Sequence, residues 1–560
     1  MRTFWIGCCA LLLIQACQPK STSPTFGEVF FSDGFQIGEY LDDGFSGENL
    51  FLLDSGWRYL GSDSIPGIER EFPGVMDTGE HILLPHRLSL PNHSMWYHWE
   101  GFLDQGVLIV DADDGVQVWL DGERVKRSPE RELFEVKGAG KRSLILRVVN
   151  NAMAGGLRKI HWMKEENYWK WKNSLQVRRD SVLTRRKLDL LEDESLKDQL
   201  EKLSFEERGE ILKSYPIVFT SPLLLLGTDG IPFLRWVSEQ GGEARLVFQG
   251  GKEVKVQSQD GIFNYDLSKE SSLSFELFQG KSHQGSFEFE LPVAKDSVKI
   301  AIWGDSQGGW ETFRKISEEI EKHQVDLSVG AGDLVNNGSE ELAYPRLLQV
   351  LGEMKTLQLL VPGNHDYDGF YEDLKPKPMH AYLFKEKQKT YGLQFFGPLA
   401  VMTLDPNTFF PVSLPEGSEQ REWMDKQLNS EKWASSPWKM VVLHQPPYSQ
   451  GWPDYHGEES IRELLEPYFH KGLIDIVQAG HTHDYERWTG EFSGNRVHFL
   501  IVGGAGGGLE KEGMSSAYPE MDLLVKKHHY GIMNLKEDAI QLQVFGLGGE
   551  VLDEFRINKK

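Results

Sequence analysis

The sequence predicts a multidomain protein in which two all-β domains precede one α/β domain. Three observations lead to this fold class. A chain of 560 residues is too long for a single hydrophobic core. Runs of β-forming residues dominate as far as residue 296, apart from a charged stretch at 164–214. From residue 297 onward, strand-like and helix-like patterns alternate, which is typical of an α/β domain.

The first 25 residues predict export. Arg2 precedes an apolar run that ends at Ala16, which is too short to span a bilayer but suits the core of a signal peptide over residues 1–17. The stretch Ile14-Gln15-Ala16-Cys17 resembles a bacterial lipobox, which implies a lipid anchor on Cys17. A plain secretory signal is the alternative. Residues 18–25 are polar and predict a tether, so we expect a bacterial lipoprotein, periplasmic or on the outer membrane or cell surface.

Cysteine content and charge exclude several classes of site. The three cysteines all lie within residues 1–17, so the remaining chain can form neither a disulfide nor a thiolate metal site. The chain has 60 Lys and Arg against 84 Asp and Glu, a net charge of −24. An acidic surface repels nucleic acid, and we therefore expect no nucleic-acid partner.

Residues 26–163 predict the first all-β domain. Strand patterns at 116–120 and 143–149 flank a hairpin turn at Asp121-Gly122. The region resembles the galactose-binding-like jelly-roll, which makes carbohydrate a candidate partner. Its aromatic residues fit a hydrophobic core as well as a platform for sugar stacking: Trp96, Tyr97, Trp99 and Trp119.

The next two segments differ in composition. Residues 164–214 are charged and poor in glycine, with leucines at helical spacing, which predicts a linker of one or two amphipathic helices. Residues 215–296 return to β patterns, and their length suits a small sandwich of the fibronectin or immunoglobulin type.

In the α/β domain, five polar clusters each follow a predicted strand: Gly304-Asp305-Ser306-Gln307, Gly332-Asp333 with Asn336-Asn337, Gly363-Asn364-His365-Asp366, His444, and Gly480-His481-Thr482-His483. In α/β folds such strand ends converge on one crevice. Aspartate, amide and imidazole groups bind zinc, manganese or iron. A pair of such ions assists phosphoryl transfer, because the ions offset the charge of the phosphate and activate water.

These clusters match, in order and spacing over residues 297–560, the calcineurin-like metallophosphoesterases. The purple acid phosphatase branch is the most similar, through GHTHDYER at 480–487, LIVGGAGGG at 500–508, and Gln420 with Trp423. The resemblance implies an αββα metallophosphoesterase sandwich. It also implies an enzyme that hydrolyses phosphomonoesters or phosphodiesters, and the choice between them stays open.

The resemblance assigns roles residue by residue. It places one metal ion on Asp305, Asp333 and His483, and a second on Asp333, Asn364, His444 and His481, with Asp333 bridging. A metal-bridging hydroxide would attack phosphorus. His365 would protonate the leaving group instead of binding metal. The two ions would be divalent or trivalent manganese, iron or zinc.

Two positions depart from the family pattern. Gln307 stands where purple acid phosphatases have glycine and most other members have a histidine ligand; its carbonyl could bind metal, or water could complete the shell. Asn336 replaces a tyrosine ligand, so we expect no purple colour. His456 and Asn337 are candidates for binding the substrate phosphate.

A second hypothesis is a surface glycan-binding protein whose phosphoesterase domain is catalytically weak. Loss of activity normally removes metal ligands, whereas here the aspartates, the asparagine and the three histidines are all present. The sequence therefore favours an enzyme.

Overall fold

The structure is a computed structural model. It describes residues 38, 40, 44, 49–67, 70, 71, 79–128, 133–268, 270, 273–292, 296–338, 340, 342–367, 378–385, 388–509 and 519–559. The predicted signal peptide, the tether and Cys17 lie outside this part of the chain. Among the described residues, no helix has the length and apolar character that crossing a membrane requires.

The N-terminal domain is a β-sandwich. One sheet has the order β3-β2-β5-β10-β7-β8 and the other β1-β11-β6-β9, with β4 paired to β11. Its core holds inward-facing side chains of both sheets, among them Trp57, Tyr97 and Trp99, while Trp96 and Trp119 form a small cluster of their own. The strands are β1 Phe51–Leu52, β2 Trp57–Asp63, β3 Glu80–Ile82, β4 His86–Ser89, β5 His93–Leu103, β6 Gly106–Ala112, β7 Val116–Leu120, β8 Glu123–Val125, β9 Leu133–Val136, β10 Gly140–Asn150 and β11 Ala154–Lys164.

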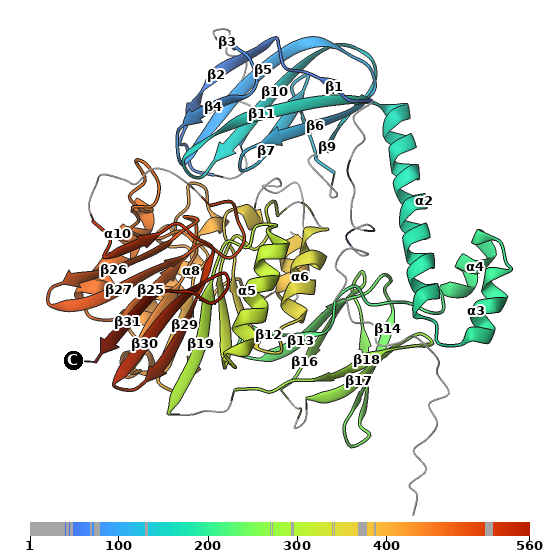
Figure 1. The fold of residues 1–560 in the computed structure, drawn as a ribbon. Helices are drawn as coiled ribbons and strands as arrows, with labels where there is room; N and C mark the ends of the chain where they lie inside the picture. The colour runs from blue at the N-terminus through green and yellow to red at the C-terminus, as the bar shows by residue number, and fades with distance from the viewer. Residues whose placement is uncertain are drawn as a thin grey trace, which may run out of the picture.

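A helical connection leaves the sandwich. It consists of α2 Glu165–Leu190, α3 Glu194–Glu201 and α4 Phe205–Leu212, and α2 runs down beside the molecule in Figure 1. Ser204 and Glu207 form a capping box that starts α4. The connection therefore consists of three helices, whereas the sequence predicted one or two. The buried Lys187 ammonium pairs with Glu239 and so ties α2 to the next domain.

Residues 215–296 divide between two sheets. Strands β14, β15, β17 and β18 form a sheet of their own, in the order β15-β14-β17-β18. Strands β12, β13 and β16 instead extend the first sheet of the C-terminal α/β domain, because β12 pairs in parallel with β21. Hydrogen bonds thus cross the predicted boundary at residue 297. The strands are β12 Leu223–Leu226, β13 Pro232–Val237, β14 Glu243–Phe248, β15 Glu253–Gln257, β16 Ile262–Asp266, β17 Ser274–Gln279 and β18 Ser282–Glu288.

The C-terminal domain packs two sheets face to face. The first has the order β16-β13-β12-β21-β20-β19-β29-β30-β31 and the second β22-β23-β24-β25-β27-β26-β28. Side chains alternate along β24: Met440 and Val442 belong to the core between the sheets, and Val441 to the core beneath the outer helices. The strands are β19 Ser297–Trp303, β20 Leu327–Ala331, β21 Leu357–Val361, β22 Gly392–Phe396, β23 Leu399–Thr403, β24 Trp438–Val442, β25 Ile476–Ala479, β26 Tyr485–Phe492, β27 Asn495–Val502, β28 Leu523–Val525, β29 His529–Lys536, β30 Ala539–Gly546 and β31 Val551–Asn558.

Helices cover the outer faces of both sheets. Phe313 and Ile316 of α5 and Leu347 of α6 join the core of the first sheet, while Met424 of α8 and Ile461 of α10 join that of the second. The layers are therefore helix, sheet, sheet, helix, which confirms the predicted αββα sandwich behind N-terminal β-sheets. The helices are α5 Trp310–Lys322, α6 Ala343–Gly352, α7 Pro378–Leu383, α8 Glu419–Leu428, α9 Glu431–Ala434 and α10 Glu459–His470, with short 3-10 turns η2 His365–Tyr367 and η3 Pro406–Thr408.

Candidate metal centre

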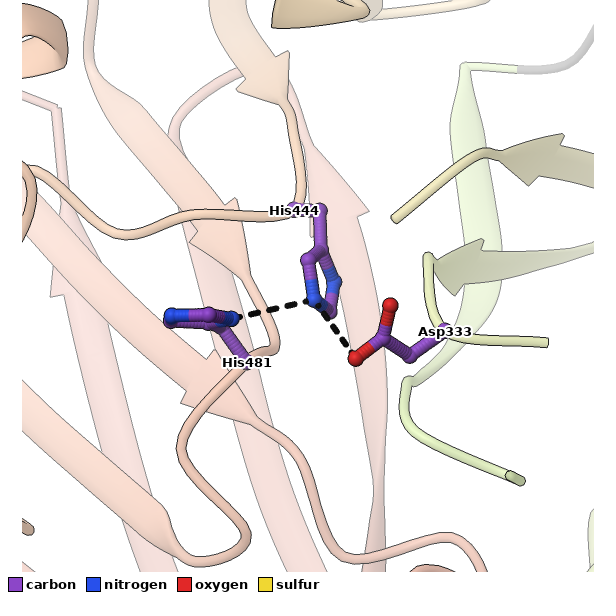
Figure 2. Close-up of side chains that lie close together, drawn as sticks. All are labelled: Asp333, His444 and His481. Carbon is purple, nitrogen blue, oxygen red and sulfur yellow. Dashed lines mark hydrogen bonds and ion pairs between the residues drawn. The ribbon is translucent and has the colours of Figure 1, made fainter. Parts of the chain in front are cut away.

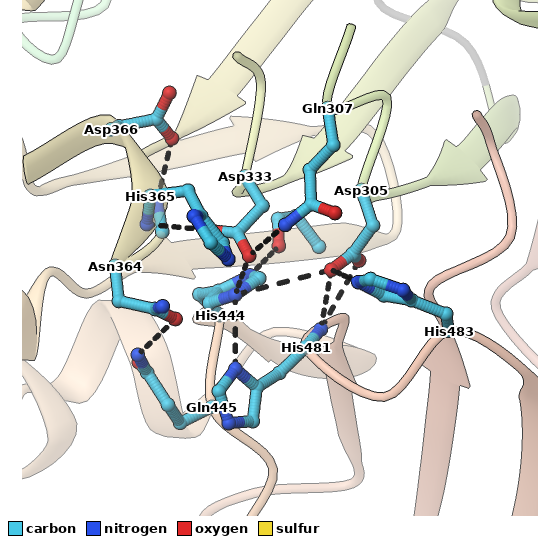
Figure 3. A network of polar contacts seen from close by, with 12 residues as sticks. Asp305, Gln307, Asp333, Asn364, His365, Asp366, His444, Gln445, His481 and His483 are labelled. Atoms are coloured by element: carbon cyan, nitrogen blue, oxygen red, sulfur yellow. Dashed lines mark hydrogen bonds and ion pairs between the residues drawn. The ribbon is translucent and has the colours of Figure 1, made fainter. Parts of the chain in front are cut away.

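Five strands of the two sheets end at one place. The strands β19, β20 and β21 of the first sheet are parallel neighbours, as are β24 and β25 of the second. Each is followed within two or three residues by a predicted ligand: Asp305, Asp333, Asn364, His444 and His481. Figure 3 shows these side chains gathered between the carboxyl ends of the strands. The topology therefore builds the cluster that the sequence predicted.

A compact set of three donors lies at its middle. Asp333, His444 and His481 offer ligand atoms that all lie within 4.8 Å of one another, and the three side chains are buried (Figure 2). His444 Nε2 lies 3.0 Å from Asp333 Oδ2 and 3.3 Å from His481 Nδ1. The opposite nitrogen, Nδ1 of His444, lies 2.7 Å from the carbonyl oxygen of Ala331, which fixes the ring orientation.

Asp305 and His483 extend this set on one side. Asp305 Oδ1 lies 3.8 Å from His483 Nε2 and 4.0 Å from His444 Nε2. Both Asp305 oxygens accept from the backbone N–H of His481, at 2.9 and 3.1 Å. His483 Nδ1 lies 2.6 Å from the carbonyl of Gly508, so the glycine-rich segment after β27 orients this ring.

Gln307 points into the same cluster. Its Nε2 donates to Asp333 Oδ2 at 2.8 Å, and its side chain is buried. Gly507 packs against this side chain, since a Cβ there would lie 2.7 Å from Gln307 Oε1. The structure thus brings Gln307 to the carboxylate that the sequence comparison assigns as the bridging one.

Asn364 and His365 lie on the other side of Asp333. The backbone N–H of His365 donates to Asp333 Oδ1 at 2.9 Å, and the imidazole is half-buried. Asn364 Oδ1 accepts from Gln445 Nε2 at 3.2 Å, and Gln445 Nε2 also donates to Asn407 Oδ1 at 2.6 Å. Gln445 is a residue that the sequence reasoning missed, and its position directly after His444 was the only signal.

The two candidate phosphate-binding residues lie next to residues that contact this cluster. Asn337 precedes Gly338, whose N–H donates to the carbonyl of His365 at 2.7 Å. His456 follows Tyr455, whose ring packs against His481 with centroids 5.5 Å apart. Trp452 also packs on His481, at 5.1 Å. The aromatic contacts of residues 452–455 were not predicted, because nothing in their spacing marks them.

The charges of the cluster shift its pKa values strongly. Burial opposes the charged form of His444, yet the carboxylates of Asp333 and Asp305 raise its pKa to about 9. Burial raises the pKa of Asp305 well above its ordinary value. Burial also lowers the pKa of His481 well below its ordinary value, and the charge of His444 adds to that effect. The carboxylates therefore favour a positive charge at His444, whereas His481 is held as the neutral imidazole, which is the form that binds a metal ion.

The backbone is unusual at four of the predicted ligands. Asp305, Gln307, Asp333 and His481 have φ angles of 61°, 35°, 49° and 74°. Residues other than glycine rarely adopt this left-handed region of backbone conformation, and such backbone strain concentrates at functional sites. The turns after the strands are thus held in costly conformations that aim the ligands at one point.

Contacts outside the ligands hold their loops. Asp366 accepts from the N–H groups of Gly363, Leu334 and Val335 at 2.8, 3.2 and 3.3 Å, linking the turns after β20 and β21. Glu486 accepts from Thr482 Oγ1 at 3.2 Å and from Ser449 Oγ at 2.7 Å. The Glu486 carboxylate thus fixes the loop that carries His481 and His483.

The donor set fits metal ions. Two carboxylates, a carboxamide and three imidazoles are oxygen and nitrogen ligands of the type that manganese, iron and zinc accept. Each histidine that lies beside a carboxylate presents one nitrogen inward, and the other nitrogens of His444 and His483 lie against backbone carbonyls. This arrangement is the usual one for imidazole ligands.

An αββα sandwich with a carboxylate and imidazole centre at its strand ends is the arrangement that the resemblance to metallophosphoesterases implies. Residues 298–485 match the family described as calcineurin-like phosphoesterase. The chain therefore contains a calcineurin-like metallophosphoesterase domain, and purple acid phosphatases are its relatives. The predicted resemblance is confirmed at this level.

Three comparisons describe the relatives. The chain is 28% identical over 268 residues to a probable purple acid phosphatase 20 of Arabidopsis thaliana, which covers 44% of this chain and 60% of that protein. It is 27% identical over 219 residues to purple acid phosphatase 21 of the same plant, covering 37% of this chain and 48% of that protein. The chain thus spans about half the length of these relatives. The structure of purple acid phosphatase PPD1 from yellow lupin (Lupinus luteus) aligns over 83% of this chain and 93% of that one, at 13% identity and a TM-score of 0.48.

Proposed function

We propose that the protein is a metal-dependent phosphoesterase that hydrolyses phosphomonoesters or phosphodiesters. The observation that carries the proposal is the convergence of Asp333, His444 and His481, whose ligand atoms lie within 4.8 Å of one another at the ends of strands from two sheets. The match of residues 298–485 to the phosphoesterase family supports the reaction class.

The proposed centre would hold two ions of manganese, iron or zinc. One would lie on Asp305, Asp333, His483 and Gln307. The second would lie on Asp333, Asn364, His444 and His481. Asp333 would belong to both sets, because it lies between them: His365 N–H donates to its Oδ1 on one side, and Gln307 Nε2 donates to its Oδ2 on the other.

The side chains around the ions would divide the work of hydrolysis. When bound, a pair of ions lowers the pKa of water and offsets the negative charge of the phosphoryl group. His365 is half-buried beside Asp333 and would donate a proton to the departing oxygen. Trp452 and Tyr455 pack on His481 and exclude water from that side of the ligand shell.

The proposal is tested by hydrolysis of p-nitrophenyl phosphate and bis-p-nitrophenyl phosphate with added manganese, iron or zinc. Asp333→Asn should lower the rate at least about 100-fold for both esters, because the bridging carboxylate is lost. Asp326→Asn is the matched control, since Asp326 precedes the same strand at its opposite end. Full activity in Asp333→Asn would refute the proposed centre. The ratio of the two rates assigns the enzyme to monoesters or diesters.

Export and lipid anchoring are a separate proposal that rests on residues 14–17. We infer that Cys17 becomes the lipidated N-terminus of the mature protein. Wild-type protein from a bacterial host should partition into detergent and carry a diacylglycerol mass on Cys17, whereas Cys17→Ser should remain in the aqueous phase. Equal partitioning of both forms would refute the anchor.

Carbohydrate remains a proposed partner on the basis of the jelly-roll resemblance alone. A platform for sugar stacking needs exposed rings, but Trp96, Trp99 and Trp119 are buried. These three residues are therefore core residues, and the glycan-binding hypothesis receives no support from them. A glycan array probed with the soluble chain tests this partner. If the chain binds no glycan on the array, the carbohydrate hypothesis is refuted.

A further inference from the structure

Gln445 joins two other carboxamides beside the metal centre. It directly follows His444, and its side chain is buried. Its Nε2 donates to Asn364 Oδ1 at 3.2 Å and to Asn407 Oδ1 at 2.6 Å, and Figure 3 shows the Gln445 amide turned toward Asn364. These bonds connect the loops that follow β21, β23 and β24, so they cross from the first sheet to the second. Gln445 therefore contacts a proposed metal ligand from the side of the other sheet.

The amide of Asn407 has its orientation fixed from the opposite side. Its Nδ2 lies 3.4 Å from the carbonyl oxygen of Pro362 and 3.5 Å from Asp405 Oδ1, and its backbone N–H donates to the same carboxylate oxygen at 3.2 Å. A carbonyl and a carboxylate can only accept hydrogen bonds. If the amide were reversed, Asn407 Oδ1 would face two acceptor oxygens. Asn407 must therefore present Oδ1 to Gln445.

Asp405 is the acceptor at which this series of amides starts. It is buried, and its Oδ2 accepts from the Tyr367 hydroxyl at 2.5 Å and from the Thr390 hydroxyl. Gln420 holds the backbone of Asp405: its Oε1 accepts from the N–H at 2.7 Å, and its Nε2 donates to the carbonyl at 2.8 Å. Burial and the charge of Asp405 raise the pKa of Tyr367 well above its ordinary value, so the hydroxyl stays a donor. The Asp405 carboxylate is therefore fixed in position.

The orientation of each amide fixes that of the next. Gln445 must direct Nε2 at Asn407 Oδ1, since two carbonyl oxygens cannot bond each other. The same Nε2 then meets Asn364, which must present its own Oδ1. That oxygen has a second lone pair for a cation, whereas the nitrogen of a carboxamide is only a donor. Asp405, Asn407 and Gln445, which we call the amide relay, thus fix which end of Asn364 lies against Gln445.

We propose that the amide relay is a positioning device for the second metal ion, which holds the Asn364 carboxamide with Oδ1 as the ligand atom and so sets the affinity of that ion relative to the first. The proposal rests on the proposed phosphoesterase centre, in which Asn364 belongs to the second ion alone. Gln445 reaches the ion through Asn364, so it is a positioning residue. The loop after β23, which supplies no ligand to the proposed centre, gains a role through Asp405 and Asn407.

Gln445→Glu tests the relay, because charge and amide orientation predict opposite results. A carboxylate added beside the centre attracts cations, so charge alone would raise the affinity for both ions. The relay predicts a lower affinity for one ion. The new carboxylate would face the oxygens of Asn364 and Asn407, and Asn364 is the residue that turns, because Asp405 and Pro362 hold Asn407. Turning Asn364 places its Nδ2 where the ion requires an oxygen.

The readout is metal binding to the full chain in the absence of substrate. Calorimetric titration of Gln445→Glu with manganese should show an affinity about 10–100-fold lower for one ion, and a change of less than about threefold for the other. Electron paramagnetic resonance gives a second signature, because the spins of a bridged pair of Mn(II) ions are coupled and those of a single ion are not. At a manganese concentration that fills both sites of the wild type, the variant should show the spectrum of an isolated ion.

Two further variants separate the relay from added charge and from damage to the fold. Gln445→Met has nearly the same length, adds no charge and lacks the donor, so it should weaken the same ion about tenfold. Gln427→Glu makes the same change of charge on the outer helix α8, where Gln427 is half-buried, and should leave both ions unaffected. Higher affinity for both ions in Gln445→Glu, equal weakening of both ions, or wild-type binding in Gln445→Met would overturn the proposal.

Hydrolysis of p-nitrophenyl phosphate by the same samples separates this proposal from the proposed function. If the wild-type chain binds two manganese ions and hydrolyses no ester, while Gln445→Met binds one ion more weakly, the catalytic proposal fails and the relay stands. If the wild type hydrolyses the ester with manganese bound, and both variants of Gln445 bind the two ions as tightly as the wild type, the relay fails and the catalytic proposal stands.

Discussion

Gly332 is the position where a single methyl group should disturb the centre most directly. It lies in the turn after β20, has a φ of 88°, and precedes Asp333. A Cβ on Gly332 would lie 2.5 Å from Nδ1 and 2.7 Å from Cγ of His444. The His444 ring is buried and lies 2.7 Å from the Ala331 carbonyl and 3.0 Å from Asp333, so it cannot move without breaking these contacts.

The expected cost of Gly332→Ala has two parts. A left-handed backbone with a Cβ costs about 1–2 kcal/mol, and forcing a buried ring aside costs about 1–3 kcal/mol more. Gly122→Ala isolates the first part, because Gly122 has a φ of 87° in the β7–β8 hairpin and a Cβ there would meet nothing within 4 Å. The difference between the two variants therefore measures the displacement of His444.

The assay has two readouts. Urea unfolding should show Gly332→Ala to be about 1–3 kcal/mol less stable than Gly122→Ala. Calorimetric titration with manganese should show an affinity about 10–100-fold lower for Gly332→Ala and unchanged for Gly122→Ala, since only the first variant moves a ligand. Equal stability of the two variants together with wild-type metal affinity in Gly332→Ala would refute the geometry assigned to His444.

Three further predictions concern single side chains. His365→Asn should retain both metal ions by elemental analysis and lose hydrolysis rate about 100-fold or more. The loss should be larger for esters of poor leaving groups than for p-nitrophenyl phosphate. A loss of metal would contradict the position of His365 outside the ligand shell. Gln307→Ala should weaken one ion more than the other in a metal titration, and equal weakening of both would count against its position at one ion. Burial lowers the pKa of His498 to about 4, so the folded chain holds it neutral while the unfolded chain binds a proton below about pH 6.5. Stability should therefore fall as the pH drops from 7 to 5, by about 2 kcal/mol from this residue, and urea unfolding of His498→Gln should show that much less pH dependence; an unchanged slope would show that His498 is not buried neutral.

The sequence could predict the ligand cluster because local patterns carry its parts. Each ligand follows an apolar strand at a turn, as Asp333 follows β20 and His444 follows β24. Parallel strands bring such turns to one edge, so the order of segments along the chain was enough to expect their meeting. The family pattern supplied the pairing of ligands with ions.

The left-handed φ angles of Asp305, Gln307, Asp333 and His481 could not be read from the sequence. Local propensity favours glycine at such positions, and tertiary contacts impose the strain on other residues. The orientation of Gln307 was left open for the same reason. Its side chain reaches Asp333 and packs beside Gly507, which comes from a segment 200 residues later, and local sequence does not predict such neighbours.

Contacts between distant segments were the other gap. The β-patterned region 215–296 suggested a separate sandwich, yet β12 hydrogen-bonds to β21 and extends the central sheet. Alternation of apolar and polar residues predicts a strand but not its neighbour. The docking of the N-terminal sandwich through Val149 and Phe410 was likewise invisible, because each residue alone resembles ordinary core.

The central claim is that five strand ends of this chain hold two metal ions that are required for phosphoester hydrolysis. The most direct test is elemental analysis of the purified soluble form, residues 18–560, combined with hydrolysis of p-nitrophenyl phosphate before and after chelation. We predict about two ions per chain, loss of turnover when a chelator removes them, and recovery on adding manganese, iron or zinc. A protein that binds no metal under any of these supplements, or that keeps its turnover after complete chelation, would contradict the account.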